Sequence, residues 1–295
     1  SCAWMRDLRK HAFENARKCS RLAGYDMLAA IDHHWHRTGY DCGIMNEFYE
    51  MKPGELPEDV LRYNGETVLL LDHGNMRNYW EGAKFRSQLR CSHFGPEEMR
   101  NCRLMWRLSK GDGNIFASGE WAVPLIPAGE IQDIGELSFN ISGNRHPVKA
   151  TLSVSLQGSG KFVDNKWDFW IFPQPSPVAA EADGPAIARF SGLFQGLSPV
   201  AASEKACAVR LLSGLDRSSL DWIRKGGSAV VLGAGAMPSS PANFQICVAG
   251  RPKGHAATVI WDHPVMREFP HDGYCGWQFH DMLTGSSVVS MDHGG

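Results

Sequence analysis

A period-two alternation of side chains over residues 67–172 constrains the fold of this chain more than any other feature. Mostly apolar side chains recur at every second position in 85–93, 102–108 and 148–156. Successive side chains of a β-strand point to opposite faces, so this period predicts strands that each bury one face. The middle of the chain is therefore expected to form antiparallel sheet.

Turn signals divide this region into short strands. "KGDGN" (110–114) and "SGNRHP" (142–147) lie between the alternating runs, and glycine- and asparagine-rich segments of this kind close β-hairpins. Regularly spaced short strands are typical of an immunoglobulin-like β-sandwich. We expect such a sandwich over residues 61–175.

A different pattern follows the linker "PQPSPVAAEADGP" (173–185). "ACAVRLLSG" and "SAVVLG" are predicted to be buried strands, and "DRSSLDWIRKGG" between them a helix with Asp216 as N-cap and Gly226 or Gly227 at its end. A β-α-β unit predicts two parallel strands with the helix on one face. Residues 176–295 are thus expected to form a small α/β domain.

Residues 1–60 have yet another character. The apolar positions Met5, Leu8, Ala12, Ala16 and Cys19 predict an amphipathic helix over 4–22. The short apolar run "YDMLAAI" (25–31) predicts a strand buried on both faces, and "LPEDVLRYNG" (56–65) a short helix. A single strand cannot form a sheet. The partner strands of 25–31 are therefore expected either elsewhere or in a part of the domain that is missing from this chain.

Composition limits the classes of partner. Thirty lysine and arginine residues against 32 aspartate and glutamate residues give a net charge of −2, so neither nucleic acid nor a membrane is expected as a partner. The eight cysteines form no CxxC pair, which argues against a zinc ribbon. The compartment stays open between bacterial periplasm, exterior and cytoplasm.

A histidine-rich stretch, "AAIDHHWHRTGY" (29–40), is the first candidate site. Asp32, His34 and His36 share one direction on an extended segment and are ordinary metal ligands. A tryptophan beside polar groups also suits a sugar, whose ring packs on the indole while its hydroxyls pair with aspartate and histidine. We favour Asp32, His33, His34 and Trp35 as contacts at a pocket rim; ordinary hydrogen-bonded histidines are a further alternative.

Other motifs carry less chemistry. Glu47 and Glu50 are the only acidic pair near the histidines, and on a helix they would share a face; the plain alternative is a solvated face. "VLGAGAMP" lacks the third glycine of a dinucleotide motif and the GK[ST] of a phosphate loop. No GxSxG motif occurs. "WDHPVMREFPHDGYCGWQFHDML" is expected to be a packed, aromatic-rich closing segment.

One family resemblance runs through these motifs. "ENARKCSRLAGYDMLAAIDHHWHRTGYDCGIMNEFYEMKPG" resembles the last helix, eighth strand and following loop of the catalytic barrel in family 2 glycoside hydrolases of β-galactosidase type. "NKWDFWIFPQP" is similar to the exit of their immunoglobulin-like domain, where Trp167, Trp170 and Pro173 match. "LDRSSLDWIRKGGSAVVLG" resembles their appended glutamine-amidotransferase-like domain. The matching residues of the first segment are Glu14, Leu22, Ala23, Gly24, Tyr25, Leu28, Asp32, Glu47, Phe48, Tyr49, Lys52 and Gly54.

The resemblance implies a fold and a function. It implies the end of a (β/α)8 barrel over 1–60, the sandwich over 61–175 and a glutamine-amidotransferase-like domain over 176–295. It also implies a retaining β-glycosidase acting on glycans, whose catalytic glutamates close barrel strands four and seven and so precede Ser1. The chain itself would then hold no catalytic residue, metal or cofactor, and would hydrolyse nothing alone.

The implied partners follow from the same resemblance. They are a carbohydrate, contacted by Asp32, His33, His34, Trp35 and Glu47, the remainder of the barrel, and a second copy of the chain in a homo-oligomer. Two other functions stay open: a non-catalytic carbohydrate-binding or oligomerisation module, and a metal-dependent hydrolase centred on the histidines.

Overall fold

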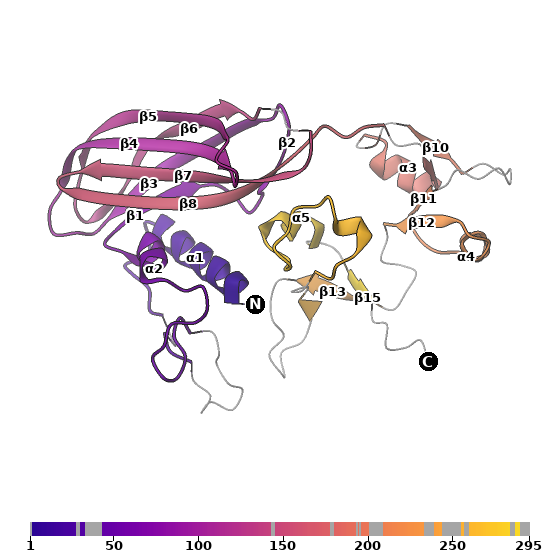
Figure 1. The fold of residues 1–295 in the computed structure, drawn as a ribbon, viewed down its shortest axis with the longest axis horizontal. Coiled ribbons are helices and arrows are strands. Elements are labelled where there is room, and N and C mark those ends of the chain that lie inside the picture. The colour runs from indigo at the N-terminus through magenta and orange to yellow at the C-terminus, as the bar shows by residue number, and fades with distance from the viewer. Residues whose placement is uncertain are drawn as a thin grey trace. The chain divides into compact units, whose positions relative to one another are not determined.

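The computed structural model describes residues 2–27, 30–32, 43–142, 145–177, 180–192, 194, 196–200, 209–232, 239–243, 255–256, 260–283 and 287–289. These form a mixed α/β protein in which most regular structure is sheet (Figure 1). The chain divides into two compact units. Unit 1 comprises Ser1–Pro173, Val248–Gly250 and Ala257–Asp281, and unit 2 comprises the remainder.

Two sheets form most of unit 1. One has the strand order β1-β3-β6 and is antiparallel; the other has the order β2-β8-β7-β4-β5 and is antiparallel except for the parallel pair β2·β8. The strands are β1 (Thr67–Asp72), β2 (Asn78–Trp80), β3 (Lys84–His93), β4 (Met99–Lys110), β5 (Ile115–Ile126), β6 (Glu130–Asn140), β7 (Val148–Gly158) and β8 (Lys161–Phe172).

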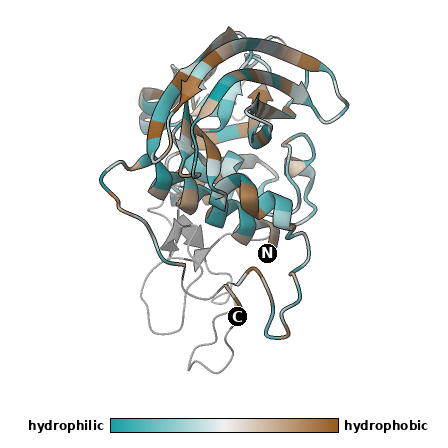
Figure 2. Cartoon of the chain, turned by 90° about the vertical axis from the view of Figure 1, so that its left-hand side faces the viewer, coloured by the Kyte–Doolittle hydropathy of each residue, from teal (hydrophilic) through white to brown (hydrophobic). Residues whose placement is uncertain are grey.

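Side chains from both sheets share one hydrophobic core. Its members include Leu89 from β3, Leu104 from β4 and Leu156 from β7, each fully buried. Figure 2 shows hydrophilic and hydrophobic residues alternating along these strands. The alternation predicted from the sequence is therefore confirmed, because every second side chain enters the space between the sheets.

Two helices accompany the sheets in unit 1. Helix α1 (Cys2–Lys18) contacts α2 (Pro57–Asn64) and β1, and Figure 1 shows both helices beside the long strands. Pro57 occupies the first turn of α2 and Gly65 follows its end, so the short helix predicted over 56–65 is confirmed. Unit 1 also contains the 3-10 helices η2 (Pro264–Met266) and η3 (Trp277–Phe279) and the first residues of helix α5 (His280–Leu283).

Two expectations for the N-terminal region are wrong. The predicted apolar face of α1 is not its buried face: Ala12 and Cys19 are exposed, whereas Phe13 and Glu14 are buried. The described part of 25–31 forms no strand, because Ile31 makes only an isolated bridge with Met45. A strand requires a neighbouring strand that pairs with its backbone N–H and C=O groups, and the described residues provide none along this apolar run.

Unit 2 contains a parallel sheet with the order β10-β9-β11-β12. Helix α4 lies between β11 and β12 in sequence, and its N-cap Asp216 accepts a hydrogen bond from the Ser219 N–H at 2.7 Å. The predicted β-α-β unit is thus confirmed. The helices and strands of unit 2 are β9 (Ala180–Ala182), α3 (Gly184–Phe190), β10 (Leu197–Pro199), β11 (Val209–Leu212), α4 (Arg217–Arg224), β12 (Ser228–Val231), β13 (Ser239–Asn243), β14 (His255–Ala256) and β15 (Ser287–Val289).

Candidate functional site

Asp32 is the predicted site residue with the best-defined surroundings. Its carboxylate accepts hydrogen bonds from Lys52 Nζ and from the Gly43 N–H, both at 2.8 Å. The backbone N–H of Asp32 donates to the Met45 carbonyl at 3.0 Å. The side chains of Asp32 and Lys52 are mostly buried, so this ion pair holds the segment 43–52 against residues 30–32.

The other predicted residues are not gathered around Asp32 by the described structure. His33, His34 and Trp35 lie outside the described residues, as does His36. Glu47 is exposed in a turn. The expected helical face of Glu47 and Glu50 is absent from this described segment, because Asn46 Oδ1 accepts the N–H groups of Phe48 and Glu50 and closes a turn instead.

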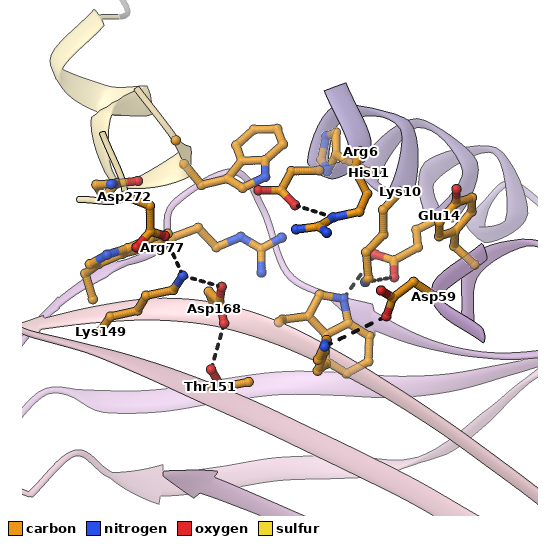
Figure 3. Close-up of a pocket in the computed structure, with 18 of the residues that line it drawn as sticks. Arg6, Lys10, His11, Glu14, Asp59, Arg77, Lys149, Thr151, Asp168 and Asp272 are labelled. Carbon is orange, nitrogen blue, oxygen red and sulfur yellow. Dashed lines mark hydrogen bonds and ion pairs between the residues drawn. The ribbon is translucent and has the colours of Figure 1, made fainter. Parts of the chain in front are cut away.

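A cavity of about 320 Å³ lies within unit 1, between α1 and the strands β7 and β8 (Figure 3). Helix α1 contributes one wall, α2 another, and residues 272–278 a third. Neither Asp32 nor Glu47 lines it. The volume is within the range of small-molecule sites. Charged groups lining it include Arg6, Asp7, Lys10, Glu14, Arg77 and Lys149.

Glu14 anchors α1 to the sheet at this cavity. Its carboxylate accepts a hydrogen bond from the indole Nε1 of Trp167 at 3.0 Å, one from Asn165 Nδ2 at 2.9 Å, and a short one from Lys10 Nζ. The charge of Lys10 and these donors hold the pKa of Glu14 below its usual range, although burial alone would raise it. Glu14 is therefore a buried carboxylate at neutral pH.

A second charged cluster lies at the other end of the cavity. Lys149 Nζ binds Asp168 at 3.0 Å and Asp272 at 2.8 Å, and Thr151 Oγ1 donates to Asp168 at 2.7 Å. Burial alone would lower the pKa of Lys149, but the two carboxylates raise it above its ordinary value. The cluster joins β7 and β8 to residues 272–278.

Asp7 has the opposite character to Glu14. Burial raises its pKa, with the charge of Arg6, 3.9 Å away, acting against that shift. Its carboxylate accepts a hydrogen bond from the Tyr274 hydroxyl at 3.1 Å. Two carboxyl groups on one helix thus have pKa values displaced in opposite directions, as groups suited to proton transfer often do.

Aromatic side chains complete the cavity wall. Trp167 and Trp170 come from β8, and Tyr274 and Trp277 from the C-terminal segment of unit 1. The ring of Trp277 meets that of His11 with 4.5 Å between centroids. Such a mixture of indole faces and polar groups can hold a sugar ring or another flat polar ligand. The prediction of a packed aromatic closing segment is confirmed only in part: Cys275 and Phe279 are buried, whereas Trp261 and Val265 at the start of the segment are exposed.

Sequence reasoning missed this cavity. The signal available was the row of charged residues Asp7, Lys10 and Glu14 at three- and four-residue spacing on α1. Charges on one helix face are usually solvated, so the pattern by itself did not indicate a buried site.

The described residues contain neither a cluster of metal-ligating side chains nor a helix that could span a membrane. Among their histidine, cysteine, aspartate and glutamate side chains, no three come together as a metal site would require. None of the described helices combines the length and apolar character needed to cross a bilayer.

One family model matches part of the chain. It is described as "Domain of unknown function (DUF8488)" and matches residues 83–173, which span β3 to β8. The match covers less than half of the chain and lies within unit 1. No curated protein matches the chain.

Solved structures give only distant likenesses. The sporulation control protein Spo0M of Bacillus subtilis is 15% identical with a TM-score of 0.26, over 38% of this chain and 50% of that one. A family 123 glycoside hydrolase from Clostridium perfringens is 12% identical with a TM-score of 0.27, over 39% and 27%. A β-glucuronidase from glycoside hydrolase family 2 is 12% identical with a TM-score of 0.27, over 58% and 20%.

The chain therefore covers half or less of each of these proteins. At such identities and TM-scores, none of the three carries an argument about this chain.

Proposed function

We propose that the chain is the C-terminal part of a retaining β-glycosidase acting on glycans. In this proposal residues 1–60 are the end of a catalytic barrel, and their segment 25–31 becomes a strand only alongside the preceding barrel strands. Residues 61–175 form an immunoglobulin-like sandwich, and 176–295 form a glutamine-amidotransferase-like domain. Asp32, His33, His34, Trp35 and Glu47 line the sugar subsite. The acid/base and the nucleophile are glutamates of the preceding barrel strands.

The contact between Glu14 and Trp167 carries this proposal. The sequence resemblance picked out both residues, in two separate motifs, and 153 positions separate them in the chain. The hydrogen bond between them joins the barrel-like segment to the sandwich. Asp32 and Lys52 are a second pair of residues that the resemblance matched and that are in contact. They form an ion pair at 2.8 Å within the barrel-like segment.

The reaction implied is a double displacement. A nucleophilic carboxylate attacks the anomeric carbon while the acid/base protonates the leaving oxygen, and water then releases the sugar from the enzyme. In retaining enzymes the two carboxyl groups lie roughly 5 Å apart. The residues of this chain would bind and orient the sugar, with Asp32 held in place by Lys52.

Hydrolysis of nitrophenyl β-glycosides tests the proposal. The chain alone should show no turnover, and turnover should appear when the upstream barrel segments are supplied with it. Replacement of Asp32 by Ala in the assembled enzyme should then lower kcat/KM, because the subsite loses its orienting carboxylate. Turnover by the chain alone that Glu47→Gln or Glu50→Gln abolishes would contradict the placement of the catalytic acids.

A second candidate is a non-catalytic carbohydrate-binding module. The specific observation in its favour is the cavity whose walls include Trp167, Trp170 and Trp277. Calorimetric titration with a panel of oligosaccharides would show saturable binding without hydrolysis. Trp277→Ala should weaken such binding, whereas Trp261→Ala should not, because Trp261 is 82% exposed and does not line the cavity.

A further inference from the structure

The cations that line the cavity of unit 1 are not equally matched by carboxylates. Lys10 pairs with Glu14, and Lys149 with both Asp168 and Asp272. Arg62 pairs with Asp59 and Asp164 on the α2 side. Among the residues that the structure describes, Arg77 forms no ion pair within 4 Å.

Arg77 is nevertheless one of the most buried charged residues, with a relative exposure of 6%. Its Nε and Nη1 atoms are buried and have no hydrogen-bond partner within the described part of the chain. The guanidinium carbon lies 5.2 Å from the centroid of the Phe169 ring, a cation–π contact that satisfies none of its N–H groups. Figure 3 shows Arg77 reaching toward α1 above the strands.

A second unsatisfied donor lies beside Arg77. The backbone N–H of Trp170 donates to the Arg77 carbonyl at 2.9 Å, so the two residues are hydrogen-bonded neighbours. The indole Nε1 of Trp170 is buried and also lacks a partner among the described residues. Both side chains line the cavity. Two side chains that line the cavity thus carry buried N–H groups without acceptors, one in a guanidinium and one in an indole.

Nearby carboxylates do not replace the missing partner. Glu14, Asp168 and Asp7 act on Arg77 through space, but burial outweighs them and lowers the pKa of Arg77. Glu14 and Asp168 are already bound by Lys10 and Lys149. A buried cation without a contacting acceptor is strongly disfavoured. The missing acceptor is therefore expected to be a ligand that enters the cavity.

We propose that this cavity binds a small oxyanion, a carboxylate or sulfate group, with Arg77 as its principal counter-charge. Negative oxygens supply the acceptors that the guanidinium and the Trp170 indole lack. The cavity volume admits a free anion or one carried on a single sugar ring. The site does not depend on the proposed hydrolysis, because it lies apart from Asp32 and Glu47.

Calorimetric titrations of the full chain at constant ionic strength test this site. Acetate, sulfate and glucuronate are the anionic probes, and glucose is the neutral probe. Glucuronate binding more tightly than acetate and sulfate would assign an anion carried on a sugar; equal affinities would assign a free anion. Failure of all three anions to bind at tens of millimolar, or equal binding of glucose and glucuronate, would overturn the proposal.

Variants separate this site from general charge effects. Arg77→Gln should weaken anion binding at least tenfold, and Arg77→Lys should retain most of it. Arg86→Gln, which removes an equal charge from an exposed side chain outside the cavity, should change the affinity less than twofold. Equal losses in Arg77→Gln and Arg86→Gln would contradict the assignment.

A second readout covers the case in which Arg77→Gln does not fold. The Nε1–H resonance of Trp170, assigned by its loss in Trp170→Phe, should shift on titration of the wild-type chain with glucuronate. An unchanged resonance at saturation would overturn the proposal. The hydrolysis assays above use a different site, so their failure would leave these results intact.

Discussion

The carboxylate of Glu14 accepts a hydrogen bond from the indole Nε1 of Trp167 at 3.0 Å and so joins helix α1 to strand β8. Both side chains are buried, at 3% and 5% relative exposure. Lys10 and Asn165 complete the surroundings of this carboxylate. A helix with a charged inner face is thus held on the sheet that contains β8 by polar contacts in addition to apolar ones.

Replacing Glu14 by Gln should destabilise unit 1. The amide keeps one acceptor oxygen but leaves the buried ammonium of Lys10 without a counter-charge, at a cost of about 3 kcal/mol in the free energy of unfolding. Urea unfolding followed by tryptophan fluorescence measures this change. Glu98→Gln, at an exposed ion pair with Arg100, should cost no more than about 0.5 kcal/mol. Equal losses in the two variants would show that Glu14 is not an anchor.

Acidification should destabilise unit 1 through two histidines. Burial, with the charge of Arg77 as the next cause, lowers the pKa of both His11 and His73 to about 4, from about 6.5 in an unfolded chain. Between these values the unfolded state binds more protons, so the free energy of unfolding falls as the pH is lowered from about 6.5 toward about 4.

The double variant His11→Gln, His73→Gln provides the comparison. Its free energy of unfolding should depend less steeply on pH across that window, as measured by urea titrations at several pH values. Asp7, whose pKa burial raises, acts with the opposite sign in both proteins, so the difference between them isolates the histidines. Identical pH slopes would refute the prediction.

Replacing Asp32 by Ala should loosen the segment 43–52. The variant loses both the ion pair with Lys52 and the acceptor for the Gly43 N–H, and a hydrogen bond to a charged group contributes about 1.5–3 kcal/mol. Exchange of the Gly43 amide hydrogen should accelerate roughly tenfold or more. Asp26→Ala, at an exposed position before the bridge, should leave that rate unchanged, and acceleration in both variants would point to a general loss of stability.

Gly135 should tolerate no side chain. Its φ of +142° is unfavourable for other residues, and a Cβ there would lie 2.5 Å from Cζ2 of Trp121. The glycine lies at the irregularity in the pairing of β3 with β6, where Trp121 Nε1 donates to the Ile134 carbonyl at 2.7 Å. Gly135→Ala should therefore lower the free energy of unfolding by about 2–3 kcal/mol.

Gly111→Ala is the matched control for that change. A Cβ at Gly111 meets nothing within 4 Å, so its effect should stay within about 0.5 kcal/mol. Thermal or urea unfolding of the two variants measures both changes in the free energy of unfolding. A loss at Gly111 as large as that at Gly135 would rule out the close approach of Trp121 as the cause.

Local patterns in the sequence were sufficient for the strands of the two sheets of unit 1 and for the β-α-β unit. Leu89, Leu104 and Leu156 alternate with polar neighbours because each strand buries one face, and that period is visible without knowledge of the partner strand. Asp216 likewise caps α4 through atoms three residues away. Interactions between residues this close in the chain can be predicted from the sequence pattern.

Only the tertiary structure decided which face of α1 is buried and where the cavity lies. The helical period favoured the stripe of Met5, Leu8 and Ala12. Glu14 is nevertheless buried, because Trp167 and Asn165 of β8, 153 and 151 residues away, provide its hydrogen bonds. Arg77 belongs to none of the motifs that the sequence analysis identified. Its guanidinium lies 5.2 Å from the centroid of the Phe169 ring, and its carbonyl accepts the backbone N–H of Trp170. Both partners lie far along the chain, so the residues around Arg77 in the sequence do not reveal these contacts.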